Sequence, residues 1–280
     1  MKDLAQADTT DEFDKPLGGL TGGARVLLER THMEAAVAEV RFVPGRDELP
    51  EASAVAVWNA LGKDRLPIFE RHAVSTVNLT VTPNGADQTT QAQHGWVLAS
   101  NDRRTVVTLL PSMVVVQTAA YARYPTSLGD PLRVALRTFA EATGASVVQR
   151  LGLRYINRLQ DAAASSPAFW RDHVRPAFAG PLVGETGGLV EALHQQVQFK
   201  LDESAAARVQ SGVFREQGVD ERYSFLVDLD VFREQALDFD ETLVADMTRQ
   251  LNRTALALFT QVLSEKYWAE LVPVAVGVDS

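Results

Sequence analysis

Three arginines at a regular spacing are the residues of this sequence whose types and positions most favour a binding site. Arg150, Arg154 and Arg158 lie four residues apart, within residues 150–159. Side chains of a strand alternate between its two faces, so these three would share one face. A guanidinium group binds carboxylates and phosphates through paired hydrogen bonds. This cationic face could therefore bind a phosphorylated ligand, an acidic peptide or RNA.

The same run offers two further candidates for contact with a ligand or partner, Tyr155 and Asn157. Counter-charge could come from Asp228 and Asp230, which share one face of a later predicted strand. Because residues 220–246 hold nine acids against two arginines, we favour ion pairing over ligand binding for the cationic face. We predict that Arg154 is largely buried and paired with acids of the C-terminal part. The binding hypothesis stays open beside it.

Other chemistry has little support in the residues. The chain has no cysteine, which excludes disulfides, thiolate metal sites and thiol catalysis. Its five histidines show no ligand spacing, so a metal site would have to be assembled across elements, for example from His72 and His94. No nucleophile motif of the G-x-S-x-G type occurs. We predict no metal and no cofactor, cannot name a catalytic residue, and favour a protein that is not an enzyme.

Composition narrows the class of protein. With 280 residues, 46% of them hydrophobic, the chain can bury a full core. A net charge of -9 argues against non-specific nucleic-acid binding, which requires a basic face. No apolar run reaches the roughly 18 residues of a membrane span, and the start lacks a secretory pattern. We therefore predict a cytoplasmic protein, outside the membrane, with a protein partner or a homo-oligomeric assembly.

Periodicity predicts strands and helices in two sequential halves. Alternating or continuous apolar runs predict strands, and stripes at helical spacing predict helices. The expected strands are residues 36–43, 73–82, 93–100, 105–110, 113–118, 150–159, 189–201, 206–214 and 223–230, and the expected helices are 51–61, 127–143 and 241–263. Short turns between strands make neighbours antiparallel. The fold class is thus α+β, with a long C-terminal helix packed on antiparallel sheet.

Composition shifts suggest four segments. Residues 1–23 are acidic and glycine-rich without an apolar pattern, which is typical of a flexible arm. Residues 24–160 form an N-terminal α+β half, and residues 161–188, rich in glycine, proline and small residues, form a linker. Residues 189–280 form a C-terminal α+β half that ends with the long helix.

The central strand also carries a resemblance. Its run from Arg150 to Asn157 reads R-L-G-L-R-Y-I-N, and it occurs together with residues 34–42, Leu258-Phe259, Glu265 and Trp268. In this combination the sequence resembles a family of sporadically distributed bacterial proteins of about this length. That family is itself uncharacterised, so the resemblance implies a fold and a patchy bacterial distribution but no activity. Patchy distribution fits mobile or defence-associated genes.

Two hypotheses for function follow. The first is a non-enzymatic interaction partner in a bacterial accessory or defence-type system. The alternative is a small-ligand or nucleotide-binding module, which could be an enzyme, with its site between the sheet and the long helix. A protein recovered in stoichiometric amount from the native host would favour the first, and stabilisation by a metabolite would favour the second.

Overall fold

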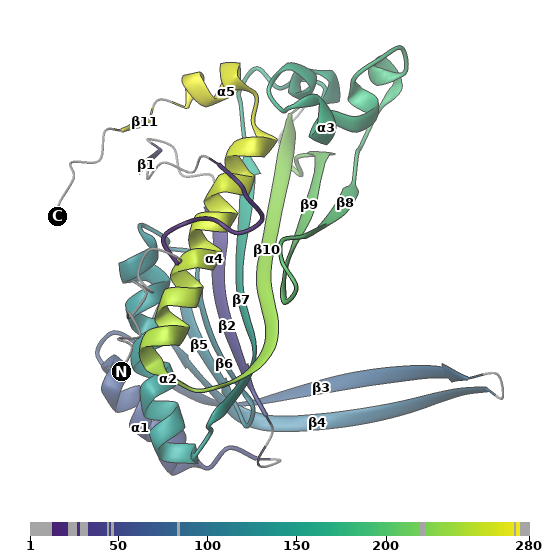
Figure 1. Ribbon diagram of the computed structural model, residues 1–280. Coiled ribbons are helices and arrows are strands. Elements are labelled where there is room, and N and C mark those ends of the chain that lie inside the picture. Colours follow the sequence, from purple (N-terminus) through teal and green to yellow (C-terminus); the bar gives the residue numbers. More distant parts are fainter. Residues whose placement is uncertain are drawn as a thin grey trace, which may run out of the picture. The chain divides into compact units, whose positions relative to one another are not determined.

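The computed structural model has mixed α+β architecture, as the sequence predicts. It describes residues 13–21, 27–28, 33–43, 45, 48–82, 85–218, 222–271 and 273–274. These residues include a nine-stranded antiparallel sheet and a long C-terminal helix, α4 (Glu241–Val262), which packs on it (Figure 1). The predicted fold class is confirmed.

The sheet has the strand order β3-β4-β5-β6-β2-β7-β10-β9-β8. Its strands are β2 (Met33–Phe42), β3 (Ile68–Thr82), β4 (Gly85–Ala99), β5 (Thr105–Leu110), β6 (Met113–Thr118), β7 (Val147–Leu159), β8 (Gln195–Lys200), β9 (Ala205–Arg215) and β10 (Tyr223–Asp238). A separate two-stranded pair joins β1 (Leu27–Leu28) to β11 (Pro273–Val274). The predicted strand at 93–100 is too short, because β4 begins eight residues earlier.

The other helices are α1 (Glu51–Leu61), α2 (Asp130–Thr143), α3 (Pro176–Ala179) and α5 (Glu265–Glu270). A π turn (Pro125–Gly129) precedes α2, and short 3-10 turns lie at Pro167–Asp172, Gly180–Leu182 and Gly187–Leu189. The α2 helix ends where Gly144 adopts a left-handed conformation, with φ of 74°. Asp240 caps α4, because its carboxylate accepts a hydrogen bond of 2.8 Å from the Leu243 backbone N–H.

The chain divides into two compact units, which differ from the sequential halves expected from composition. One unit comprises Met1–Ala36, Gly152–Glu234 and Asp246–Ser280, and the other comprises Val37–Leu151 and Gln235–Ala245. Four elements, β2, β7, β10 and α4, each contribute residues to both units. An element of 10 or more residues can extend through more than one local core, and composition along the chain does not reveal this.

The second unit has a core between its strands and the helices α1 and α2. Alternate residues of β2 are buried, as the two-residue period predicts, and Phe42 at its end stacks on Phe139 of α2 at 5.5 Å between ring centroids. Phe239 packs against the same Phe42 ring at 5.8 Å. The hydroxyl of Ser53 in α1 donates to the backbone carbonyl of Ala142 in α2. These contacts hold both helices against one apolar layer.

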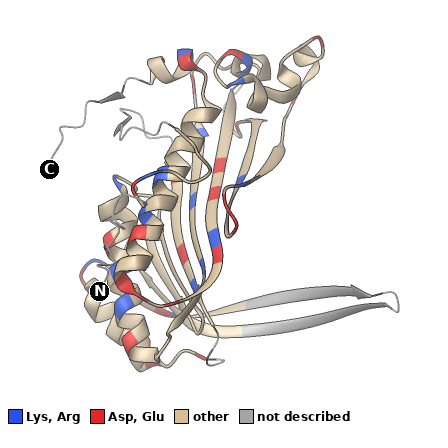
Figure 2. Ribbon diagram, viewed as in Figure 1, with Lys and Arg blue, Asp and Glu red and all other residues tan. Residues whose placement is uncertain are grey.

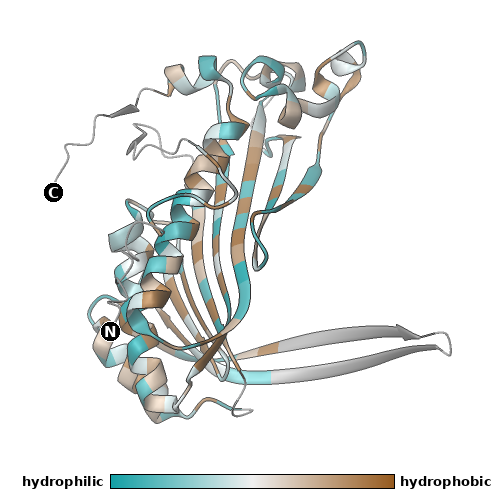
Figure 3. Cartoon of the chain, in the orientation of Figure 1, coloured by the Kyte–Doolittle hydropathy of each residue, from teal (hydrophilic) through white to brown (hydrophobic). Residues whose placement is uncertain are grey.

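The first unit buries the predicted stripe of α4 beside β7 and β10. Leu251, Ala255, Leu258, Phe259 and Val262 of α4 are all buried. Figure 3 shows hydrophobic residues alternating with hydrophilic ones along the strands and on α4. Such alternation is the pattern expected of elements with one covered face.

The predicted linker, residues 161–188, is a packed part of the first unit. Trp170 is fully buried, and its indole N–H donates to the backbone carbonyl of Tyr223 at 3.1 Å. Its ring meets Phe225 and Tyr267 at 5.8 Å between centroids. The glycine- and proline-rich turns of residues 161–188 pack on the core of this unit. Composition had suggested that they connect two halves.

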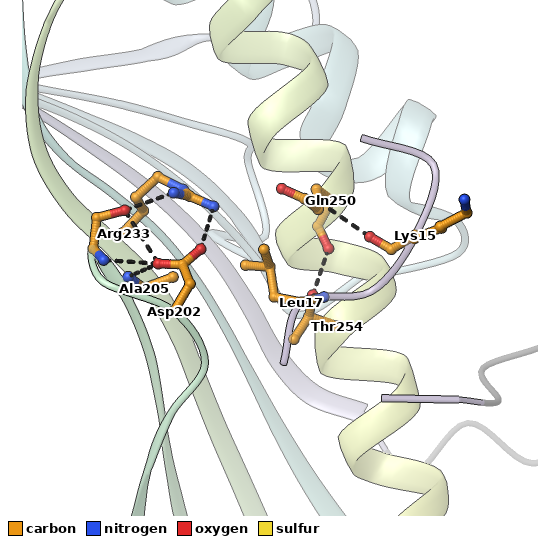
Figure 4. Close-up of polar contacts among 8 residues, drawn as sticks. Lys15, Leu17, Asp202, Ala205, Arg233, Gln250 and Thr254 are labelled. Carbon is orange, nitrogen blue, oxygen red and sulfur yellow. Dashed lines mark hydrogen bonds and ion pairs between the residues drawn. The ribbon is translucent and has the colours of Figure 1, made fainter. Parts of the chain in front are cut away.

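The N-terminal segment also departs from the expectation of a flexible arm. Within the first unit, Leu17 N–H donates to Thr254 Oγ1 at 3.0 Å, and Gln250 Nε2 donates to the carbonyl of Lys15 at 3.2 Å (Figure 4). Arg253 forms an ion pair of 2.6 Å with Asp14. The part of the arm that is described therefore docks on α4, while residues 1–12 and 22–23 lie outside the described residues.

Candidate interaction surface

Arg154, the middle arginine of the cationic face, forms a two-point ion pair with Asp228. Its Nε and Nη2 atoms lie 2.8 and 2.6 Å from the two carboxylate oxygens. The Asp228 side chain is 7% exposed, whereas that of Arg154 is 48% exposed. Asp228, the counter-charge expected from the sequence, thus supplies the pair, but the prediction that Arg154 is largely buried is wrong.

A hydrogen bond and the charge of Asp228 shift the ionisation of Arg154. The hydrogen bond raises the pKa of the Arg154 guanidinium above its ordinary value, and the charges of Asp228 and Asp230 act in the same direction against burial. Asp230 lies directly opposite Arg208 in the register of β10 and β9. The two predicted counter-charges therefore lie on one face of β10, and both act on the charge of Arg154.

The flanking arginines also have carboxylate partners. In the second unit, Arg150 Nη1 lies 2.5 Å from Glu39 Oε1 of β2. In the first unit, Arg158 binds both oxygens of Glu216, with Nε 2.8 Å from Oε1, and its Nη1 lies 3.4 Å from Glu34. All three arginines of the cationic face are thus paired within the chain. Figure 2 shows acidic and basic residues intermixed over the described strands and α4.

Glu216 collects several donors around one carboxylate. Burial alone would raise the pKa of Glu216, but hydrogen bonds from Arg158 and from the hydroxyl of Ser224 outweigh it, so the pKa lies below its ordinary value. The side-chain amide of Gln160 donates a further bond of 3.2 Å. This carboxylate is consequently held in its charged form and ties the end of β7 to the β9–β10 connection.

Tyr155 and Asn157, the other predicted contact residues, point away from the cationic face. The Tyr155 hydroxyl donates to Asn252 Oδ1 of α4 at 2.7 Å, and Asn157 Nδ2 donates to the backbone carbonyl of Val227 at 3.4 Å. Both residues are buried. The structure therefore separates them from the arginines and places them among the contacts between β7 and its neighbours in the first unit.

The most extended feature of the second unit is a two-stranded ribbon, of which the sequence predicted only the β3 side, residues 73–82. Strands β3 and β4 pair over their full 15 residues, from Ile68↔Ala99 to Thr82↔Gly85. Strand β5 pairs with β4 only from Trp96 to Ala99. Residues 74–82 and 85–93, called the β3–β4 ribbon here, therefore continue past β5 for nine residue pairs (Figure 1). At about 3.4 Å per residue, the ribbon is roughly 30 Å long.

The composition of the ribbon differs from that of the chain. Residues 75–92 contain one charged residue, Asp87, whereas 22% of the whole chain is charged. Strand β3 is the end of the sheet order, so its outer edge has no neighbouring strand in the described part of the chain. Exposed edges are usually protected from pairing by charges, proline or bulges. The strand residues of this ribbon carry little of that protection.

An aromatic stack fixes the root of the ribbon. Phe69 of β3 lies between Trp58 of α1, at 4.8 Å, and Trp96 of β4, at 4.6 Å, with rings nearly parallel in both pairs. Lys63 and Arg71 cover the two ends of the stack, 4.5 and 5.6 Å from the respective ring centroids. The tryptophans are far apart in sequence, so no local pattern could have predicted this stack.

Side-chain contacts and one close backbone approach hold the same root in place. The Trp96 indole N–H donates to the carbonyl of Leu49 at 3.1 Å, and Arg71 pairs with Glu48 at 2.8 Å. A Cβ atom at Gly95 would lie 2.0 Å from the carbonyl oxygen of Leu109, so only glycine allows β4 to approach β5 here. The ribbon therefore leaves the sheet from a well-packed base.

A cavity of about 110 Å³ lies at this root, between Glu48, Arg71, His72, His94 and Trp96. His72 is opposite Gly95 and His94 is opposite Ala73 in the strand register, so the two histidines fall on opposite faces of the β3–β4 pair. They do not converge as a metal site would require. Among the described residues, no group of three or more His, Asp or Glu side chains could hold a metal ion.

The alternative hypothesis placed a ligand between the sheet and α4. In the first unit, buried side chains of α4 occupy this side of the helix, and the hydrogen bond between Tyr155 and Asn252 joins β7 directly to it. This hydrogen bond is a direct contact between the sheet and α4 on the side where that hypothesis places its ligand.

No model of a known protein family matches this chain, and no curated protein gives a match either. None of the helices in the described residues is both long and apolar enough to cross a membrane.

Proposed function

We propose that this chain is a non-enzymatic interaction protein and that it binds a protein partner through the β3–β4 ribbon. The proposal rests on one observation. Over nine residue pairs, β3 and β4 pair with each other and with no third strand in the described part of the chain. A two-stranded ribbon is only marginally stable in water, whereas three or more strands can be stable independently. Contact with a partner would supply the missing stabilisation.

The charge distribution supports a protein partner over an anionic ligand. Each arginine of the cationic face already has a carboxylate at hydrogen-bonding distance within the chain. A phosphate or nucleic acid would have to compete with these carboxylates, and the net charge of -9 would repel it at longer range. An almost uncharged ribbon presents no such barrier to another protein.

A role in a bacterial accessory or defence-type system is part of the same proposal. Its support is the sequence resemblance carried by the run from Arg150 to Asn157 and the patchy distribution that this resemblance implies. An interaction protein without a catalytic centre fits the binding or neutralising component of such a system.

A truncated ribbon tests the proposal. Residues 75–92 are replaced by Asn-Gly, a sequence that favours a two-residue hairpin turn between Val74 and Gln93. The variant keeps the aromatic stack and the pairing of β4 with β5, so its melting temperature should stay close to that of the parent. A tagged parent protein should recover a stoichiometric protein from the native host, and the truncated variant should not.

The Arg154→Ala variant serves as the control, because it changes the cationic face and leaves the ribbon intact. It should still recover the partner at a temperature where it is folded. The proposal is refuted if the truncated variant still recovers the partner and the Arg154→Ala variant does not. The binding site would then be the cationic face.

A further inference from the structure

We infer that the partner of the ribbon is a second copy of this chain, joined through antiparallel pairing of β3 with β3 of the other copy. This inference rests on the proposed function, since it names the occupant of the same ribbon. Strand β3 is 15 residues long and is the end strand of the sheet. In an antiparallel ladder, every second residue directs its backbone N–H and C=O away from its partner, here β4, so an outer edge of this length offers a continuous row of donors and acceptors.

The charges of β3 permit pairing with itself. Around a two-fold axis, the interface uses the same residues from both copies, so any charge near the axis would meet its own copy. Residues 73–82 contain no charged residue. The charges of β3 lie nearer the root, where Glu70 pairs with Arg103 at 2.7 Å and Arg71 pairs with Glu48 at 2.8 Å. Self-pairing of the distal part therefore brings no like charges together.

The residue types of β3 also suit a homotypic pair. If the axis passes Asn78, then Thr76 meets Thr80 of the other copy and Val77 meets Leu79. Threonine pairs and pairs of β-branched or aliphatic residues are favourable neighbours across strands. The other end strand, β8, has only six residues and includes Lys200, so it lacks both the length and the neutrality.

A second copy meets the stability requirement of the ribbon. Pairing β3 with β3 converts two marginal two-stranded ribbons into one four-stranded sheet in the order β4-β3-β3-β4. This exceeds the three strands that independent stability requires. The same step pairs the outer β3 edges of both copies at once, which a partner that binds one ribbon would not do.

Charged variants of β3 provide the test. One variant carries Thr76→Lys and Thr80→Lys, and the matched variant carries Thr76→Glu and Thr80→Glu. Light scattering coupled to gel filtration should give the parent protein twice the 30.6 kDa mass of one chain. For each variant alone, the dissociation constant of the dimer should be at least about tenfold higher than that of the parent, because like charges face each other. An equimolar mixture of the two variants should recover the dimer, which also shows that both are folded.

A parent protein that is monomeric at every concentration overturns the inference, and so does a dimer that survives in both charged variants alone. These results are separate from the test of the proposed function. The parent could be monomeric and recover a different host protein only when its ribbon is intact. That result would support the proposed function and exclude a second copy as the partner. A truncated variant that still recovers its partner would eliminate the proposed function itself.

Discussion

The pair between Arg154 and Asp228 shows that the two partners of one ion pair can have very different surroundings. The guanidinium is half exposed, and its carboxylate partner is nearly inaccessible. Loss of the arginine would therefore leave a buried carboxylate without its donors, with Asp230 close by on the same strand. The cost of breaking this pair is set by the acid, because an unpaired buried acceptor is more costly than an unpaired exposed donor.

We expect Arg154→Ala to lower the free energy of unfolding by about 1–3 kcal/mol, the cost of an unsatisfied buried acceptor. This is less than the roughly 3–5 kcal/mol that full burial of both charges would imply. Urea denaturation of both proteins measures this difference, and the slope of the unfolding free energy against urea concentration should be unchanged.

The matched control for this prediction is Arg103→Ala. Arg103 is 56% exposed, similar to Arg154, but its partner Glu70 is 50% exposed. Its loss should cost about 1 kcal/mol or less. Equal costs for the two variants would contradict the view that burial of the carboxylate decides the effect.

Glu216 should contribute to the dependence of stability on pH. Because its pKa is lower in the folded state than in the unfolded chain, its contribution is present above the unfolded pKa of about 4.5 and is lost as pH falls through the folded value. We expect the parent to be more stable than Glu216→Gln near neutral pH, with a difference that shrinks as pH falls below about 4. Denaturation midpoints of both proteins between neutral and acidic pH measure it. A difference independent of pH would refute this role.

At the scale of elements, α4 makes two sets of contacts, and its apolar stripe predicts only one of them. Its apolar side is buried in the first unit, as predicted, while Gln250, Arg253 and Thr254 bind the N-terminal segment. Gly18 follows that segment with φ of 68°, a conformation that favours glycine, and a Cβ there would lie 3.0 Å from Leu201 Cδ2. The segment is therefore fitted between α4 and the end of β8.

Removal of this segment should destabilise the protein. We expect deletion of residues 1–20 to lower the melting temperature by about 2–6 °C, since two hydrogen bonds and one ion pair contribute about 1–2 kcal/mol together. Deletion of residues 1–12 is the control, because it retains Asp14, Lys15 and Leu17. Differential scanning calorimetry of both proteins gives the comparison. Equal melting temperatures for the longer deletion and the parent would restore the original expectation of a dispensable arm.

At the scale of the whole molecule, the two compact units share four continuous elements. Strands β2, β7 and β10 and helix α4 each contribute residues to both units. Composition along the chain suggested a boundary at residues 161–188, but burial of Trp170 and its bond to Tyr223 place that segment within one unit. Glycine and proline mark turns reliably, and they do not by themselves mark the ends of a core.

The sequence alone determined the elements that depend on local periodicity. The apolar stripe of α4, the alternation along β2 and β7, and the cap at Asp240 follow from side-chain spacing within one element. The α+β class and the opposite sign of the charges on residues 150–158 and 228–230 follow in the same way. These features need only neighbours within a few residues, which the sequence displays directly.

Only the tertiary structure decided which distant residues meet. The start of β4 at Gly85 was missed because residues 85–92 are polar and lack alternation, and only pairing with β3 identifies them as strand. The stack of Trp58, Phe69 and Trp96 and the half-exposed state of Arg154 likewise depend on other elements. Cross-strand register and burial are set by the balance of contacts over the whole sheet, so they cannot be predicted from a residue's neighbours in sequence.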